Sequence, residues 1–114
     1  MSTYNAQQLS ADVCVAAQLD PAAMAWAARN GFKSVINNRP DFEGGPDQPT
    51  SAAIEAAAKA AGLQYAFLPV SPAVQTPQEI ARMAQLLAEL PKPILAFCRT
   101  GTRSGKLYRA AIGG

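Results

Sequence analysis

The sequence predicts an α/β fold in which a mainly parallel sheet carries helices on both faces. Short apolar runs alternate along the chain with alanine-rich or amphipathic segments of helical length. The breaks between these segments hold the Pro, Gly, Asp and Thr residues that end strands and cap helices. The chain has 114 residues and no repeat or low-complexity linker, so residues 1–114 are expected to form one domain with a modest core.

Four short runs rich in β-branched and aromatic residues predict the strands. They are expected at residues 12–17, 32–37, 63–70 and 94–97. The last run, ILAF, is uniformly apolar, as a central strand covered on both faces should be. Because alanine buries little area, larger side chains must carry the core. Those expected there are Phe67, Leu68, Ile94, Leu95 and Phe97.

Capping residues mark where the helices between these strands begin. Asp20 followed by Pro21 opens the first helix, and Thr50 or Ser51 caps the second. The segment TPQE from Thr76 is a capping box with proline just inside the third helix. The helices are expected at residues 21–30, 51–61, 77–90 and 103–112.

The composition argues against several classes of function. A net charge of +2 with no basic block disfavours nucleic acid as a partner, and no apolar stretch reaches the ~20 residues of a membrane span. The N-terminus lacks the pattern of a signal peptide, so a cytoplasmic location is expected. The chain has no histidine, which excludes Ser-His-Asp triads, Cys-His dyads and the usual zinc sites; no metal or other cofactor is expected.

The motif that carries chemistry follows the last strand. It consists of Cys98, Arg99, Thr100, Gly101, Thr102, Arg103 and Ser104. A strand–loop–helix turn of this kind directs backbone N–H groups at one point, and the helix N-terminus adds partial positive charge. Gly101 permits a backbone conformation that a residue with a Cβ atom resists. The motif predicts an anion-binding loop in which Arg103 offers a bidentate fork.

The same groups act on the sulfur of Cys98. N–H dipoles and two arginines should lower the pKa of this thiol below its usual ~8.5, and Ser104 can donate a hydrogen bond to the thiolate. Such a thiolate is a nucleophile suited to a small anionic substrate. The alternative, a cysteine that only fills the core, is disfavoured by the complete motif. Cys14 is expected to be an inert thiol, and a resolving disulfide with Cys98 is the less favoured alternative.

Charged residues outside the motif admit two interpretations. Asp41, together with Glu43 and Asp47, either supplies a general acid at the pocket rim or belongs to a solvated turn. Arg39 either points toward the pocket and attracts anions or forms a structural salt bridge. Arg99 either adds positive potential at the pocket mouth or projects into solvent.

Two resemblances extend this interpretation. The segment CRTGTRS resembles the active-site loop of rhodanese-type sulfurtransferases, which also place four residues between Cys and Arg. From about Leu9 to Leu107, the order of elements and the segments VINNRPDFE and LPVSPA resemble the phosphatase-like domain of beta-lactamase hydrolase-like proteins. That resemblance implies a dual-specificity-phosphatase-like fold with a four-stranded, mainly parallel sheet flanked by helices. It also implies that Cys98 is the nucleophile and Arg103 the anion clamp.

The chain departs from the phosphatase pattern at three points. The loop has four residues between Cys98 and Arg103 instead of five, Phe97 replaces histidine, and the loop from Val70 to Ala73 lacks the catalytic aspartate. Expulsion of an alkoxide or phenoxide needs a general acid, whose loss typically costs about 10²–10⁴-fold in rate. Sulfite or a stable thiolate leaves without one.

The sequence therefore predicts, first, a sulfurtransferase in which Cys98 takes sulfane sulfur from thiosulfate or a persulfide. The alternative is a protein-tyrosine or dual-specificity-type phosphatase that cleaves a phosphoester through a phosphocysteine. A third hypothesis is a non-catalytic oxyanion-binding or redox-sensing module. The resemblance also implies a partner, because related domains often stand beside a persulfide-oxidising metallo-β-lactamase-like enzyme.

Overall fold

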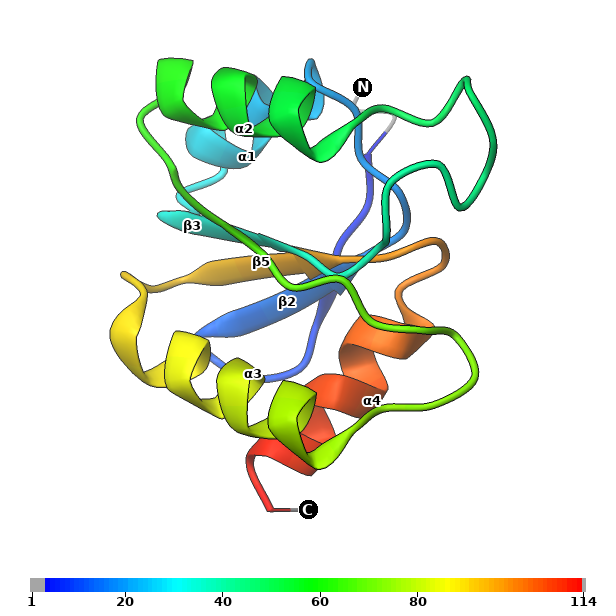
Figure 1. Ribbon diagram of the computed structural model, residues 1–114. Coiled ribbons are helices and arrows are strands. Elements are labelled where there is room, and N and C mark those ends of the chain that lie inside the picture. The colour runs from blue at the N-terminus through cyan, green and yellow to red at the C-terminus, as the bar shows by residue number, and fades with distance from the viewer. Residues whose placement is uncertain (1–3, 114) are drawn as a thin grey trace.

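A sheet lies between two layers of helices in the computed structural model, which describes residues 4–113 (Figure 1). Helices α1 (Ala23–Arg29) and α2 (Ser51–Ala60) cover one face. Helices α3 (Pro77–Glu89) and α4 (Thr102–Ala111) cover the other. Each face buries its own apolar cluster against the sheet. Within residues 4–113, no helix has the length and apolar character needed to cross a membrane.

The sheet has five strands in the order β1-β2-β5-β3-β4. Neighbouring strands among β2 (Val13–Ala16), β5 (Ile94–Phe97), β3 (Ser34–Asn37) and β4 (Gln64–Phe67) pair in parallel. The mainly parallel α/β sheet predicted from the sequence is thereby confirmed. The two-residue strand β1 (Gln7–Gln8), antiparallel to β2, adds a fifth strand to the four expected. Strand β1 could not be recognised from the sequence, because its two residues are exposed glutamines and show no alternation of apolar and polar side chains.

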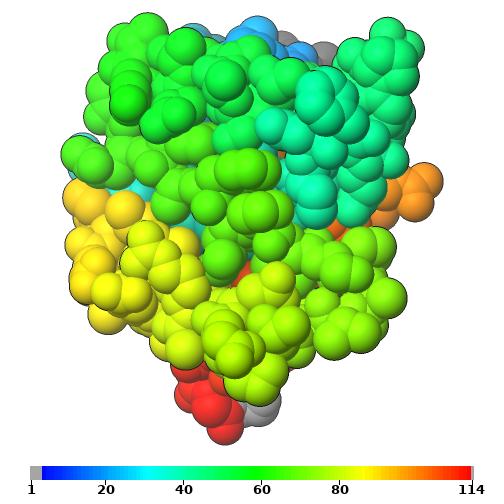
Figure 2. All heavy atoms as spheres, in the orientation of Figure 1, coloured from blue at the N-terminus to red at the C-terminus, as the bar shows by residue number. Residues whose placement is uncertain are grey.

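The parallel strands end in a common row. Phe97, the last residue of β5, lies opposite both Ala16 of β2 and Asn37 of β3, and Asn37 lies opposite Phe67 of β4. The segments that follow these strands therefore emerge at one edge of the sheet. In Figure 2 the segments after β3 (teal) and β4 (yellow-green) form the right side of the molecule, and an orange segment projects between them.

Local chemistry accounts for the starts of α2 and α3. Thr76 and Glu79 form the predicted capping box, with Thr76 Oγ1 accepting from Glu79 N at 3.1 Å. Thr50 Oγ1 accepts from Ala53 N at 3.2 Å, so Thr50 is the cap of α2. Helix α1 begins two residues later than expected: its cap is Ala22, without a side-chain bond, and Asp20 Oδ1 accepts from Ala23 N at 2.9 Å. The largest difference in bounds concerns the third expected strand, residues 63–70, of which only Gln64–Phe67 is a strand.

The core is built as expected around β5, but Phe67 is a correction. Ile94, Leu95 and Phe97 are fully buried, whereas Phe67 is 40% exposed. Phe67 is the last residue of β4, the edge strand of the sheet, and every residue of this strand is at least partly exposed. Helix side chains contribute instead, with Met24, Ile54 and Met83 completely buried among them.

Candidate active site

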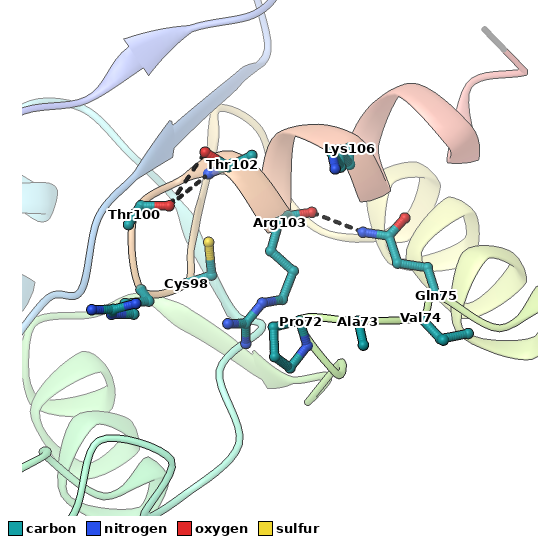
Figure 3. A pocket seen from close by; sticks show the side chains of 10 residues that line it. Pro72, Ala73, Val74, Gln75, Cys98, Thr100, Thr102, Arg103 and Lys106 are labelled. Carbon is teal, nitrogen blue, oxygen red and sulfur yellow. Dashed lines mark hydrogen bonds between the residues drawn. The ribbon is translucent and has the colours of Figure 1, made fainter.

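Cys98 lines a pocket of about 390 Å³ at the carboxyl edge of the sheet (Figure 3). In this view the anion loop and the start of α4 lie on one side and the segment after β4 lies on the other. Although Cys98 is only 1% exposed, it faces this hollow and is not sealed within apolar packing. The residues that line the pocket are Pro72, Ala73, Val74, Gln75, Cys98, Arg99, Thr100, Thr102, Arg103 and Lys106.

The anion loop is held against the end of β2. Cys98 N donates to Ala16 O at 3.3 Å, and Gln18 N donates to Arg99 O at 3.2 Å. Gly101 adopts φ +93°, the left-handed conformation for which its lack of a Cβ atom suits it. This turn directs Gly101 N toward the sulfur, to which it donates at 3.1 Å. The loop thus supplies a backbone donor to Cys98, as the sequence predicts.

The pKa of the Cys98 thiol is lowered. Burial by itself would raise this pKa, but hydrogen bonds from the backbone and hydroxyl of Ser104 and from the amides of Thr100 and Gly101 outweigh burial. These donors favour the negative charge of the thiolate. The predicted direction of the shift agrees with this arrangement, but its causes are backbone amides and the Ser104 hydroxyl, and not the two arginines that the sequence suggested.

Arg103 is held by a carboxylate and keeps one edge free. Its Nη1 donates to Glu43 Oε2 at 3.0 Å and to Val70 O at 3.1 Å, and its Nη2 donates to Glu43 Oε1 at 3.0 Å. Three of the five N–H donors of a guanidinium are thereby used. The Nε–H and the second N–H of Nη2 have no partner among the described residues, and they lie on the same edge of the plane. That edge can receive two oxygens of a tetrahedral anion.

Glu43, the carboxylate that binds Arg103, comes from the loop after β3. Glu43 also accepts from Arg39 Nε at 2.9 Å, so one carboxylate bridges two guanidiniums. Burial raises the pKa of Glu43, but the bonds from Arg103 and Arg39 outweigh burial and lower it. Glu43 is therefore ionised at neutral pH and unsuited to act as a general acid. Gly44 makes room for this pair, because a Cβ atom there would lie 2.6 Å from Arg39 Nη2.

Arg39 and Asp41 both make contacts within the loop region that follows β3. Arg39 forms the salt bridge, although a smaller hollow beside the main pocket is lined by Arg39, Arg99 and Arg103. Asp41 Oδ1 accepts from Ser51 N at 2.8 Å at the start of α2. Neither Asp41 nor Asp47 lines the main pocket, and no carboxylate does so within residues 4–113.

The pocket also includes residues that the motif did not indicate. Lys106 lies one helical turn after Thr102 on α4, so helical spacing applied to the predicted helix would have found it. Gln75 Nε2 donates to Arg103 O at 3.1 Å and has no signal in the sequence. Arg99 lines the pocket and is exposed, which is compatible with both of its interpretations.

Cys14 lies within β2, away from the anion loop. It is opposite Leu95, three residues before Cys98 on β5. At about 3.3 Å per residue, this offset is about 10 Å along the strands, beyond the ~7 Å limit for the Cα atoms of a disulfide. Burial raises the pKa of Cys14. The geometry agrees with an inert thiol and not with a resolving disulfide.

Known proteins share both the sequence and this fold. A beta-lactamase hydrolase-like protein of Agrobacterium fabrum is 46% identical over 68% of this chain, a region that makes up 18% of that protein. This chain thus corresponds to about a fifth of its curated relative. The crystal structure of a candidate phosphatase from Neisseria meningitidis has a TM-score of 0.84 and 33% identity, covering 94% of this chain and 78% of that one.

A more distant structure shares the fold alone. The P. aeruginosa protein TpbA, solved in complex with pTyr, has a TM-score of 0.67 and 19% identity, covering 96% of this chain and 65% of that one. Residues 5–113 match the family described as beta-lactamase hydrolase-like protein, phosphatase-like domain. The match spans nearly the whole chain, including the anion loop and the segments after β3 and β4. The chain therefore belongs to the phosphatase-like domain family of beta-lactamase hydrolase-like proteins.

Proposed function

We propose that this domain is a cysteine-dependent phosphatase that acts on small anionic phosphoesters, with Cys98 as the nucleophile. One observation carries the proposal: a thiol with a lowered pKa faces an open pocket beside the unpaired edge of Arg103. The family and the solved relatives support this reaction over the sulfur transfer that the sequence predicts first. The cations Arg99 and Lys106 at the pocket add attraction for an anionic substrate.

The proposed reaction has two steps. In the first, Cys98 Sγ forms a bond to phosphorus while the bond between phosphorus and the leaving oxygen breaks. Backbone N–H groups of the loop and the free edge of Arg103 hold the remaining phosphoryl oxygens. In the second step, water breaks the S–P bond, releases inorganic phosphate and returns the thiolate.

The absence of a carboxylate from the described pocket lining sets an expectation for the substrate. Without a general acid, the leaving oxygen must depart with its charge, so phenoxides should leave far more readily than alkoxides. The rate with aryl phosphates should rise steeply as the leaving phenol becomes more acidic. A flat dependence would indicate an acid that the proposal does not contain.

Sulfur transfer is a second candidate, and two observations favour it. The loop has four residues between Cys98 and Arg103, and no carboxylate lines the described pocket. With thiosulfate, Cys98 would bond to the outer sulfur while sulfite leaves, and the Cys98 persulfide would pass that sulfur to cyanide or to a thiol. That chemistry would pair this domain with a persulfide-oxidising metallo-β-lactamase-like enzyme in the same process.

One experiment separates these candidates. The protein is incubated with p-nitrophenyl phosphate or with thiosulfate, quenched in acid and measured by intact mass. Phosphatase chemistry predicts one added phosphoryl group, and sulfur transfer predicts one added sulfur atom. Each adduct should persist in Cys14→Ser and vanish in Cys98→Ser. Oxyanion binding with neither adduct nor turnover would overturn both and leave the non-catalytic module.

A further inference from the structure

Asn38 and Ser104 form a buried polar pair beside the nucleophile. Ser104 Oγ lies 2.8 Å from Asn38 Oδ1, and both residues are completely buried. Asn38 directly follows β3, and Cys98 directly follows the neighbouring parallel strand β5. The two residues therefore lie at the same edge of the sheet, where Asn38 N donates to Phe97 O at 2.8 Å. The Ser104 hydroxyl also acts on Cys98, because it helps to lower the pKa of that thiol. This hydroxyl therefore interacts with both an amide oxygen and the nucleophilic sulfur.

A second hydrogen bond determines which atom of Asn38 faces Ser104. Asn38 Nδ2 donates to Leu68 O at 3.0 Å. Turning the amide by 180° would place Oδ1 against that carbonyl, leaving two acceptors without a proton between them. Oδ1 must therefore face Ser104. Because a carbonyl oxygen can only accept, the Ser104 hydroxyl donates its proton to Asn38.

The single proton of the hydroxyl cannot serve two acceptors at once. While it is donated to Asn38, Ser104 Oγ can only accept a hydrogen bond from the S–H group of Cys98. After Cys98 ionises, its sulfur favours donors. Ser104 can turn its proton to that sulfur only if Asn38 Oδ1 is left without a donor in a fully buried position.

We propose that Asn38 is a positioning residue that holds the Ser104 proton away from the sulfur in the thiol state and yields it when the thiolate forms. The proton stays bonded to Ser104 Oγ throughout, and only its acceptor changes. Asn38 thereby stabilises the thiol form and limits the fraction of protein that carries the thiolate. The proposal deepens the proposed function, and only its consequence for turnover rests on that function.

Other charged groups near Cys98 act independently of this exchange. Arg99, Arg103 and Lys106 line the pocket, while Glu43 and Arg39 act through Arg103. Their effect on the sulfur is present whether or not Asn38 can accept a proton. A cycle of substitutions at Asn38 and Ser104 therefore isolates the exchange from the surrounding field.

The test is a double-mutant cycle made in Cys14→Ser protein, so that Cys98 is the only thiol. The rate of alkylation by iodoacetamide is measured against pH for the parent, Asn38→Ala, Ser104→Ala and the double variant. Asn38→Ala should move the midpoint down by about one pH unit, the effect of about one hydrogen bond. Ser104→Ala should move it up. Adding Asn38→Ala to Ser104→Ala should change nothing further.

A purely structural role for Asn38 gives a different pattern. Loosening of the loop would shift the midpoint equally with and without the Ser104 hydroxyl, and this result would overturn the proposal. So would an upward shift in Asn38→Ala. Far-UV circular dichroism and thermal unfolding check that each variant is folded.

A measurement that leaves Asn38 intact covers the case in which Asn38→Ala does not fold. The side-chain amide signals of Asn38 are followed by NMR through a pH titration of Cys14→Ser protein. They should move with the same midpoint as Cys98 alkylation, and in Ser104→Ala they should not move. Signals that stay constant in the Cys14→Ser parent would contradict the proposal. The coupling can be observed even if no substrate turns over, so a failure of the proposed function is separately recognisable.

Discussion

Cys14 and Cys98 lie in or directly after neighbouring parallel strands, yet their thiols are held in opposite ways. Burial acts on both and raises the pKa of each. For Cys14 nothing offsets burial, so its pKa is raised. For the more deeply buried Cys98, hydrogen bonds from Ser104, Thr100 and Gly101 outweigh burial, and its pKa is lowered.

The difference comes from the backbone around each sulfur. Cys14 lies within β2, where it pairs with Gln8 on one side and Leu95 on the other, so the surrounding amides belong to the sheet. Cys98 lies where β5 ends and the chain turns into α4, and there the amides of Thr100, Gly101 and Ser104 point at the sulfur instead of pairing with a strand. The position of a cysteine relative to the end of a strand thus decides its acidity more than its depth does.

The largest effect should come from removing each thiol in turn. Cys98→Ser should abolish turnover of aryl phosphates or thiosulfate, at least 10³-fold in kcat/KM, because a hydroxyl in this loop has no base to activate it. Cys14→Ser should leave turnover unchanged. Steady-state kinetics on both variants measures this contrast. Equal losses of kcat/KM in the two variants would show that Cys98 and Cys14 do not differ in their importance for turnover.

Arg103→Lys should produce the next largest loss, about 10²-fold in kcat/KM. Lysine keeps the charge but lacks the planar guanidinium group. In Arg103, one edge of that group donates to Glu43 and the other is free to bind an oxyanion. The matched control is Arg109→Lys, a change on the exposed side of the same helix. If the Arg103 variant kept full activity, charge alone would account for anion binding.

Two glycines test whether loop geometry sets the acidity of Cys98. Gly101 and Gly62 have φ values of +93° and +83°, so alanine at either position should cost about 1–2 kcal/mol of stability. Of these two glycines, Gly101 is the one whose N–H donates to the sulfur of Cys98, at 3.1 Å. Gly101→Ala should therefore move the midpoint of Cys98 alkylation toward the ~8.5 of a free thiol, and Gly62→Ala should not. If both variants had the same midpoint, the geometry of the loop at Gly101 would not determine the acidity of Cys98.

The smallest effect concerns the carboxylate that holds Arg103. The lowered pKa of Glu43 means that its contribution to stability is present above the unfolded value of ~4.3 and is lost as pH falls through the folded pKa. Near neutral pH, Glu43→Gln should cost about 1 kcal/mol, after allowance for solvent screening. Chemical denaturation across pH 3 to 7 measures the difference.

The control for this last experiment is an exposed ion pair elsewhere on the surface. Glu55 pairs with Lys59 at 3.3 Å on α2, with both side chains well exposed. Glu55→Gln should change stability little at any pH. A difference between wild type and Glu43→Gln that persisted unchanged at acid pH would show that ionisation of Glu43 is not its source.

The anion loop could be predicted because its chemistry is local. Cys98, Gly101 and Arg103 lie within six residues of one another, and a strand before them and a helix after them can be recognised from the sequence. The caps at Thr50 and Thr76 were accessible for the same reason. A short local segment places its own atoms, so its pattern carries most of the geometry.

The partners of the loop could not be predicted, because they come from distant segments. Glu43 and Asn38 meet Arg103 and Ser104 across sixty or more positions of the chain, through the parallel register of β3 and β5. In sequence, Glu43 is equivalent to its neighbours Asp41 and Asp47. Only the fold distinguishes the carboxylate that binds Arg103 from the one that accepts a hydrogen bond from Ser51 N at the start of α2.

The sequence by itself determined the order of the described strands and helices apart from β1, and it indicated the proposed nucleophile and the nature of its loop, because capping, periodicity and backbone turns act over a few residues. Tertiary structure decided which carboxylate holds the arginine, where the serine proton lies and that no acid enters the described pocket. Those outcomes depend on which strands lie next to each other, because neighbouring strands bring the segments after them together at one edge of the sheet. These segments are far apart in the chain, so no local sequence pattern predicts that they meet.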